Sequence, residues 1–252
     1  MKINNTVKRT LEILDLLSKN PNGLTLGEIT LDLDYPKTSM YDILTTLTAY
    51  NVVEISDPRL KSYAIGVRAF TVGNTYIHNT DIVKVSREIL EQLGDKLGRT
   101  IFIGKENQNK IVYLYKYEPS NAIITTSNIG TLNEIYFTSL GKAIYAYKDA
   151  LNGLLDDIDY VPKTARTITN KEDFKKELIV VRAQGYAVDN REGDEHLSCI
   201  GAPVFNHEGN VSFAISASGF YTDAMDIDYI SQKVKQAANE ISIRLGYHGN
   251  NM

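Results

Sequence analysis

The only cysteine of the chain lies near a histidine and an aspartate, residue types that hold metals or respond to oxidants. Cys199 follows His196 after two intervening residues, and Asp189 precedes both. A metal site of this kind needs a second ligand pair, which the sequence lacks. A buried thiol beside a loop histidine is therefore the favoured interpretation, and we expect no metal, no cofactor and no cysteine nucleophile.

Hydroxyl side chains form a second group that can bind a ligand. Ser216 and Ser218 alternate with apolar residues along an expected strand, so both lie on one face of it. Thr138 and Ser139 open an expected helix, whose first backbone amides are suited to a carboxylate. The residues alone also allow a plainer interpretation, in which the serines bond to the backbone and Thr138 only caps its helix.

The segments around these residues show both strand and helix patterns. Antiparallel strands bracketed by helices predict an α+β domain, in which a sheet with one helical cover houses a small-molecule pocket. The expected helices span residues 82–97, 140–155, 171–183 (after a capping box at 169–172) and 227–245. The expected strands span residues 100–105, 111–117, 186–190, 199–205 and 211–218.

The N-terminal segment, residues 1–66, follows a different plan. A first amphipathic helix begins at Thr6, and a capping box at Thr25 and Glu28 begins a short second helix. Pro36 suits the first position of a third helix that runs to Tyr50, because it needs no amide partner there. Two short strands around a turn complete the order that is typical of a winged helix-turn-helix, a module that inserts one helix into the major groove of DNA.

The third helix and the hairpin supply the predicted DNA contacts. One face of the helix is apolar, whereas the opposite face carries small hydrogen-bonding side chains. Cations at the hairpin tip can contact phosphate without reading bases, although a solvated turn would have the same composition. The predicted contact residues are Lys37, Thr38, Ser39, Tyr41, Asp42 and Thr45 on the helix, with Arg59 and Lys61 at the tip.

Six short motifs in this chain resemble the IclR-type transcriptional regulators. They occur in the family's order and are LDYPKTSMY (33–41), YAIG (63–66), TSLGKA (138–143), GYAVDNRE (185–192), CIGAPVF (199–205) and SASG (216–219). The resemblance implies a winged helix-turn-helix at residues 1–66, a linker helix at 67–79 that helps to pair two subunits, and a GAF-like or profilin-like α/β effector-binding domain at 80–252.

The resemblance also favours the ligand interpretation of the polar residues. Matching positions in family members line the effector site, and the pocket would suit a small organic acid or a related metabolite. In this chain those positions are Ser139, Leu140, Asp189, Leu197, Cys199, Ser216 and Ser218.

Charge limits the DNA-binding prediction. The chain has a net charge of −4, and residues 1–78 hold equal numbers of acidic and basic side chains. Because phosphate neutralisation supplies much of the affinity for DNA, one such head should bind weakly, and we expect a homodimer or homotetramer with several heads on one site. Asp42 departs from the resemblance, because the family often has a basic residue there. A carboxylate can accept from cytosine but repels phosphates.

Taken together, these patterns predict a cytoplasmic, ligand-responsive DNA-binding regulator that is not an enzyme, with repression favoured over activation. No apolar run is long enough to span a membrane, and no phosphate loop or nucleotide fingerprint is present. Two alternatives stay open. One is a metabolite or redox sensor or a small-molecule enzyme that uses the head for protein pairing, and the other is a constitutive regulator whose pocket has decayed.

Overall fold

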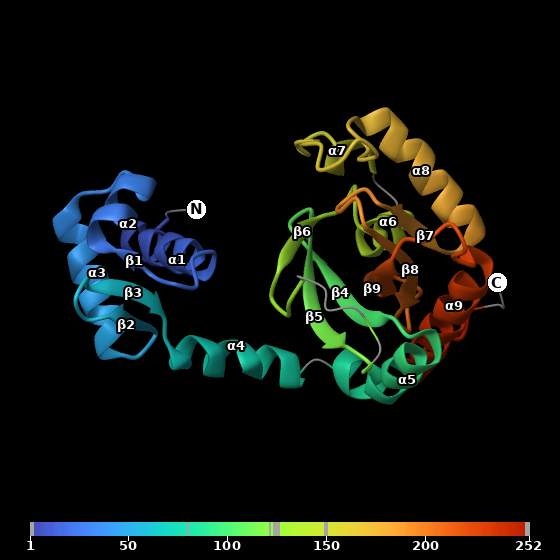
Figure 1. Cartoon of the computed structure of the whole chain (residues 1–252), viewed down its shortest axis with the longest axis horizontal. Coiled ribbons are helices and arrows are strands. Elements are labelled where there is room, and N and C mark those ends of the chain that lie inside the picture. Colours follow the sequence, from blue (N-terminus) through green and yellow to red (C-terminus); the bar gives the residue numbers. More distant parts are fainter. Residues whose placement is uncertain (1–2, 80, 121, 123–126, 149–150, 250–252) are drawn as a thin grey trace. The chain divides into compact units, whose positions relative to one another are not determined.

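The protein folds as two units, residues 1–79 and 80–252, each with its own core (Figure 1). This computed structural model describes residues 3–79, 81–120, 122, 127–148 and 151–249. We call the smaller unit the head and the larger unit the sensor domain, and each is described by itself. The predicted α+β organisation is confirmed.

Three helices of the head begin where their capping residues predict. They are α1 (Asn5–Ser18), α2 (Leu26–Leu33) and α3 (Lys37–Ala49). The Asn4 side chain accepts from two amides at the start of α1, and the predicted capping box between Thr25 and Glu28 is formed at the start of α2. Pro36 is the N-cap of α3 rather than its first helical residue, a shift of one position.

The wing of the head is a three-stranded sheet rather than the predicted hairpin. Strands β2 (Val53–Asp57) and β3 (Ser62–Ile65) pair as expected, and β1 (Leu24–Thr25) adds to the free edge of β3. A two-residue strand carries no periodicity, so the sequence does not reveal it. Helix α4 (Val67–Asn79) follows the wing at the expected linker position.

The sensor domain is built on one antiparallel sheet of six strands in the order β6-β5-β4-β9-β8-β7. The strands are β4 (Thr100–Asn107), β5 (Lys110–Tyr117), β6 (Leu132–Glu134), β7 (Ala187–Asn190), β8 (Leu197–Phe205) and β9 (Val211–Phe220). The helices are α5 (Asp81–Leu97), α6 (Ser139–Tyr145), α7 (Leu151–Leu154), α8 (Lys171–Gln184) and α9 (Ile227–Arg244).

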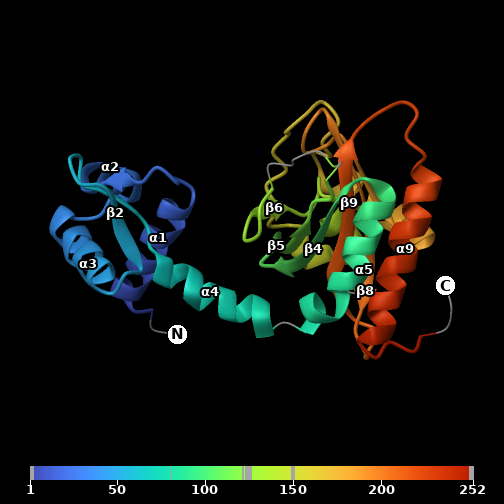
Figure 2. The same cartoon turned by 60° about the horizontal axis from the view of Figure 1, so that its bottom comes forward.

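Helices cover both faces of this sheet, so the prediction of a single cover is wrong. Helices α5 and α9 lie side by side on one face (Figure 2). On the other face, Leu140 and Ile144 of α6 share a buried cluster with Phe102 of β4 and Ala214 of β9. The central strands are buried along nearly their whole length, which is the pattern of a sheet packed on both faces.

One predicted helix end and one predicted cap in the sensor domain are also wrong, although α8 begins at Lys171 as expected. The expected helix over 140–155 ends at Tyr145, whose buried hydroxyl donates to the Asn109 side chain at 2.7 Å. This contact holds the last residue of α6, and the helix stops there although the apolar spacing continues into α7. The cap of α8 is Asn170, which accepts from the Asp173 amide, so the predicted box at 169–172 is displaced by one residue.

Gly201 of β8 allows α6 to approach the sheet, and this generates a stability prediction. A Cβ atom at Gly201 would lie 2.8 Å from the carbonyl oxygen of Ser139, which cannot move independently of α6. We expect Gly201→Ala to lower the free energy of unfolding by about 1–3 kcal/mol in a chemical denaturation experiment. Gly153→Ala is the matched control, since no atom lies within 4 Å of its added Cβ. Equal stability of the two variants would contradict the close approach.

Candidate functional site

A cavity of about 170 Å³ lies between the sheet of the sensor domain and the start of α6. Three aromatic rings and several hydroxyl groups line it, together with two carboxylates. All seven residues predicted to contact an effector lie on its wall: Ser139, Leu140, Asp189, Leu197, Cys199, Ser216 and Ser218. The structure therefore brings together residues that are up to 79 positions apart in the sequence, from Ser139 to Ser218.

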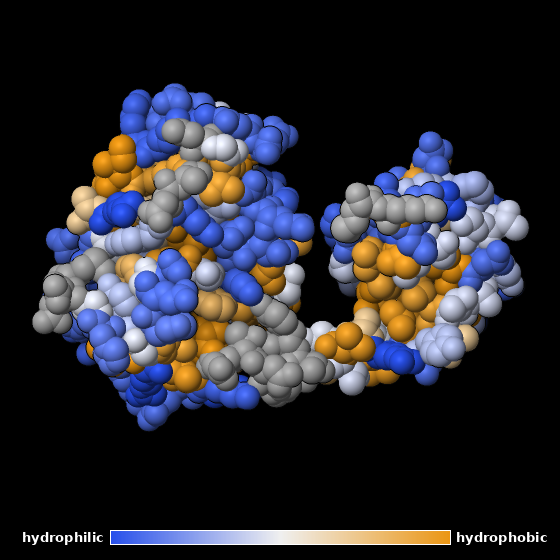
Figure 3. Space-filling model, turned by 180° about the vertical axis from the view of Figure 1, so that it is seen from behind, coloured by the Kyte–Doolittle hydropathy of each residue, from blue (hydrophilic) through white to orange (hydrophobic). Residues whose placement is uncertain are grey.

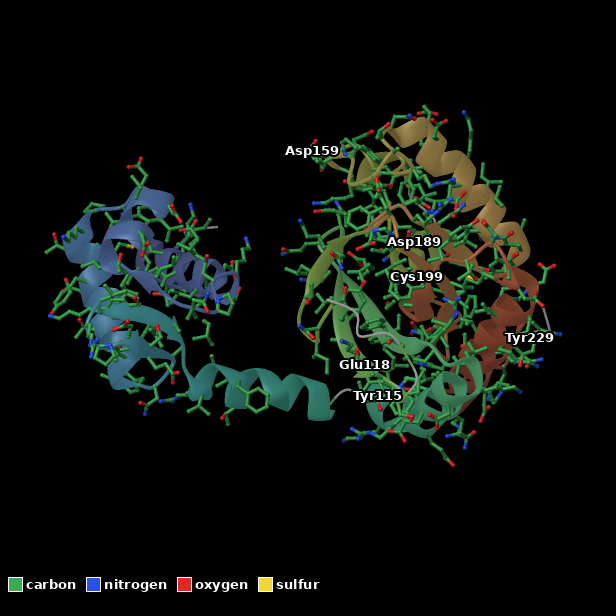
Figure 4. All side chains as sticks on the ribbon, in the orientation of Figure 1. Tyr115, Glu118, Asp159, Asp189, Cys199 and Tyr229 are labelled. Carbon is green, nitrogen blue, oxygen red and sulfur yellow. The ribbon has the colours of Figure 1, made fainter. Side chains whose placement is uncertain are left out.

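Strand register explains why these side chains meet. Asp189 of β7 pairs with Cys199 of β8, and Cys199 pairs with Ser218 of β9. Directly opposed residues of antiparallel strands point to the same face, so the three side chains form a row across the sheet. The Cys199 thiol donates to the Ser218 hydroxyl at 3.2 Å, and Figure 4 shows Asp189 and Cys199 near one another within the domain.

Other lining residues were not predicted. Asn133 donates to the Tyr113 hydroxyl at 3.3 Å, and both lie at the wall beside Phe137. Tyr113 belongs to a predicted strand, and its inward position follows from alternation once that strand's buried face is known. The remaining unpredicted residues are Phe102, Ser127, Gly193 and Asp194, and Thr138, which the sequence singled out, also lies on the wall.

The Thr138 side chain caps the start of α6. The Thr138 hydroxyl accepts from the Gly141 amide at 3.1 Å and donates to the Glu134 carbonyl at 2.9 Å. Helix α6 has only seven residues, so its dipole is weak compared with that of the longer helix that was predicted. The capping role of Thr138 is confirmed, and binding of a carboxylate by the first amides of α6 stays a prediction.

Asp189 is the buried carboxylate of the cavity, with only 7% of its surface exposed. Burial raises the pKa of its carboxyl group to about 7, because the charged form loses its contact with water. The Glu192 amide donates to Asp189 at 2.8 Å and opposes this shift, but it does not cancel it. Asp189 can therefore be neutral or ionised near physiological pH.

A buried ion cluster fixes the loop that carries Glu192. Lys142 of α6 is 1% exposed, and its ammonium donates to carboxylates of Glu177 and Glu192 and to the Val188 carbonyl, at 3.2, 2.5 and 2.9 Å. A lysine ammonium has three donors, so all of them are used. The cluster ties α6 and α8 to the end of β7, next to Asp189.

The geometry at Cys199 argues against a redox or metal site. Burial raises the pKa of its thiol, which disfavours the thiolate that reacts with oxidants and binds metals. His196 is exposed, and it is not among the residues that line the cavity. Within the described part of the chain, no three His, Cys, Asp or Glu side chains are grouped so that they could hold a metal ion.

The predicted DNA-contact residues lie on the surface of the head, with one exception. Ser39 is half-buried, and its hydroxyl accepts from the Arg9 guanidinium at 3.1 Å. Arg9 also lies over the Tyr35 ring, so α1 is tied to the start of α3. The exposed residues are Lys37, Thr38, Tyr41, Asp42 and Thr45 on α3, and Arg59 and Lys61 on the wing.

The wing tip has a defined turn. The Asp57 carboxylate accepts from the amides of Arg59 and Leu60, and Lys61 has a positive φ of 52°. An Asx turn of this kind holds the tip in one conformation, with the exposed Arg59 beside it.

None of the described helices is long and apolar enough to cross a membrane.

The raised pKa of Asp189 makes stability depend on pH. Because its folded pKa lies above the ordinary value near 4, the favourable contribution of the protonated form is complete below about pH 4 and is lost as pH rises through about 7. We expect Asp189→Asn to raise the free energy of unfolding, relative to the natural chain, by about 2 kcal/mol more at about pH 8 than at about pH 5.

Thermal unfolding at several pH values checks this expectation. Glu195→Gln is the matched control, because Glu195 is an exposed carboxylate of the same β7–β8 loop and does not line the cavity. It should follow the natural chain at every pH. If the stability of Asp189→Asn changed with pH in the same way as that of the natural chain, the raised pKa of Asp189 would be contradicted.

Comparison with known proteins identifies both units. A family model described as the IclR helix-turn-helix domain matches residues 6–55, and one described as the C-terminal domain of bacterial IclR transcriptional regulators matches residues 74–243. The Thermotoga maritima IclR crystal structure is similar over 96% of this chain and 99% of its own, with 31% identity and a TM-score of 0.74.

Two further relatives match nearly the full length. The transcriptional repressor AllR of Escherichia coli is 28% identical over 244 residues, which cover 95% of this chain and 90% of AllR. An IclR homologue from Microbacterium hydrocarbonoxydans, solved in complex with 4-hydroxybenzoate, shares the fold with a TM-score of 0.82 at 15% identity, over 96% and 99% of the two chains. The chain belongs to the IclR family of helix-turn-helix transcriptional regulators, which are not enzymes.

Proposed function

We propose that this regulator changes its binding to an operator when a small organic acid or related metabolite occupies the sensor-domain cavity. The observation that carries the proposal is a polar-lined cavity in the same chain as a winged helix-turn-helix. Its DNA contacts are the predicted residues of α3 and the wing, and its effector contacts are the seven predicted residues on the cavity wall.

The size and lining of the cavity support a small polar effector. A volume of about 170 Å³ is well below that of a site for a drug-sized ligand. Hydroxyl groups of Ser216, Ser218 and Tyr113 can donate to an acid or accept from its other polar groups. The Microbacterium homologue binds an aromatic hydroxy acid, which supports an acid as the ligand class for this chain.

Signal transmission requires that the effector bind two arrangements of the protein unequally. The cavity touches α6 and the β7–β8 loop, which the Lys142 cluster joins to α8. Ligand contacts with Ser139 or Gly193 therefore act on elements that are already coupled. We propose that the linker helix α4 converts the difference between the two arrangements of the protein into an altered spacing of paired heads on DNA.

Pairing of subunits follows from the charge and surface of the head. Its balanced charge gives a single head little attraction for phosphate, so two or four heads are needed on one site. Figure 3 shows apolar side chains gathered on a face of the head. Exposed apolar side chains lie on α1 and α4: Val7, Leu11, Val67, Phe70 and Val72. We propose a homodimer or homotetramer that uses such surfaces.

We propose that the protein acts in the cytoplasm and that repression is its main output. A protein bound across a promoter blocks the polymerase without any further contact, and AllR is a repressor of the same family.

The DNA-binding face generates a mutational prediction. We expect the double variant Lys37→Ala, Arg59→Ala to bind an operator fragment at least tenfold more weakly at fixed salt, because each head loses two phosphate or base contacts. The salt dependence of binding should also become shallower. Fluorescence anisotropy with DNA selected by the full-length protein measures both effects.

The control is the double variant Lys19→Ala, Lys96→Ala, which makes the same charge change at exposed positions away from α3 and the wing. It should bind the fragment with nearly the natural affinity. Equal affinity of both double variants and the natural chain would show that the assigned face does not contact DNA. Circular dichroism of each variant separates this result from loss of the fold.

A further inference from the structure

The cavity has negative groups but no positive group to receive an acid. Its described lining includes the carboxylates of Asp189 and Asp194 and no lysine, arginine or histidine. Asp194 is exposed to solvent, whereas Asp189 is buried. An ionised acid that entered would therefore face the buried carboxylate without a neutralising charge, and two unpaired charges in one small cavity are costly.

Lys142, the cation of the adjacent ion cluster, is not available to the ligand. Its ammonium contacts Glu177, Glu192 and the Val188 carbonyl, which use all three of its donors. Lys142 is 1% exposed, and it is not part of the cavity wall. Turning it towards the cavity would leave Glu192 buried and unpaired, so a ligand cannot gain this cation at low cost.

Two neutral groups beside Asp189, the Tyr113 hydroxyl and the Cys199 thiol, keep their protons at neutral pH. Burial raises the pKa of Tyr113, on β5, to about 12, and it also raises the pKa of the Cys199 thiol on β8. Glu192, in the β7–β8 loop, is paired with Lys142, which also contacts Glu177 of α8. Among the described lining residues, Asp189 is thus the buried carboxylate that can gain or lose a proton when a ligand binds.

We propose that a carboxylate effector binds in this cavity together with one proton, which is held between the effector's carboxyl group and Asp189. The proton comes from hydronium or a buffer acid in the solvent, whose bond to that proton breaks as the O–H bond of the effector and Asp189 pair forms. The pair then carries a single negative charge, as expected for two carboxylates that share a site. The inference rests on the proposed function, because it concerns the same effector cavity.

The protonation state of Asp189 then decides whether the cavity binds an acid or a neutral ligand. A neutral ligand with a hydroxyl group can donate to the ionised carboxylate and needs no proton. An acid instead binds to the protonated form, so its apparent affinity falls about tenfold for each pH unit above the pKa of Asp189. The ligand class that the cavity accepts therefore changes with pH, from acids at low pH to neutral hydroxylated compounds at high pH.

Isothermal titration calorimetry of the full chain tests the proposal. The probes are acetate, glycolate, lactate, pyruvate and benzoate, with glycolamide, lactamide and benzamide as uncharged counterparts. Binding is first measured at about pH 5.5, where Asp189 is largely protonated. For each acid that binds, titrations at about pH 8 in buffers of different ionisation enthalpy give the number of protons taken up.

We expect at least one acid to bind at the lower pH, to take up about one proton at about pH 8, and to weaken about tenfold from there to about pH 9. Asp189→Asn should bind the same acid without proton uptake and with an affinity that is independent of pH. Glu195→Gln, an exposed carboxylate away from the cavity wall, should keep both the proton uptake and the pH dependence.

Two results would overturn the proposal. In the first, an acid binds the natural chain equally well from about pH 6 to about pH 8.5 without proton uptake. In the second, no acid binds either the natural chain or Asp189→Asn at about pH 5.5, including when the amides do bind. If the amides bind while no acid does, proton-coupled recognition of an acid is refuted, although the cavity still binds a ligand. Failure of the proposed function would instead be seen as unchanged operator affinity with a bound ligand.

Discussion

The cavity of the sensor domain holds a buried carboxylate, Asp189, and the described residues of its wall include no lysine, arginine or histidine. Asp189 lies at the cavity wall, while the cation of the adjacent ion cluster, Lys142, is held by Glu192, Glu177 and a backbone carbonyl. The ion cluster fixes the loop whose amide donates to Asp189, so the same interaction that stabilises the fold also defines the polarity of the cavity. Because burial of an unpaired charge is costly, the cavity can adjust its charge by gaining or losing a proton.

The head obeys a different constraint, because its charges cancel. A balanced module gains little from the general attraction between cations and phosphate, so recognition rests on a few exposed side chains and on the joint action of several heads. Contacts from α1 hold the start of α3, through Arg9 to Ser39 and to the Tyr35 ring. Arg9 has no motif that distinguishes it in the sequence, and its role as a support for the recognition helix is visible only in the folded head.

Local signals in the sequence predicted the helices with strong caps and the strands with clear alternation. The features that were not predicted involve contacts between residues far apart in the sequence. The capping box at Thr25 and the alternation of Ser216 and Ser218 gave their elements correctly. Helix α6 ends at Tyr145, whose hydroxyl contacts Asn109, 36 residues away, and apolar spacing reveals neither the end nor the contact. The seven cavity residues were placed by family resemblance, whereas the pairing of Lys142 with Glu192 follows only from the way the sheet and helices pack.

The most direct test of this account is a carbon-13 NMR titration of the aspartate carboxyl groups in the full chain, with Asp189→Asn used to assign the Asp189 signal. The account predicts a midpoint for Asp189 at about pH 7, because burial disfavours its charged form. A midpoint at about pH 4, which is the ordinary pKa of an exposed aspartate, would show that the Asp189 carboxylate is well solvated or paired. Proton-coupled binding of an acid in this cavity would then be contradicted, because it requires the raised pKa of Asp189.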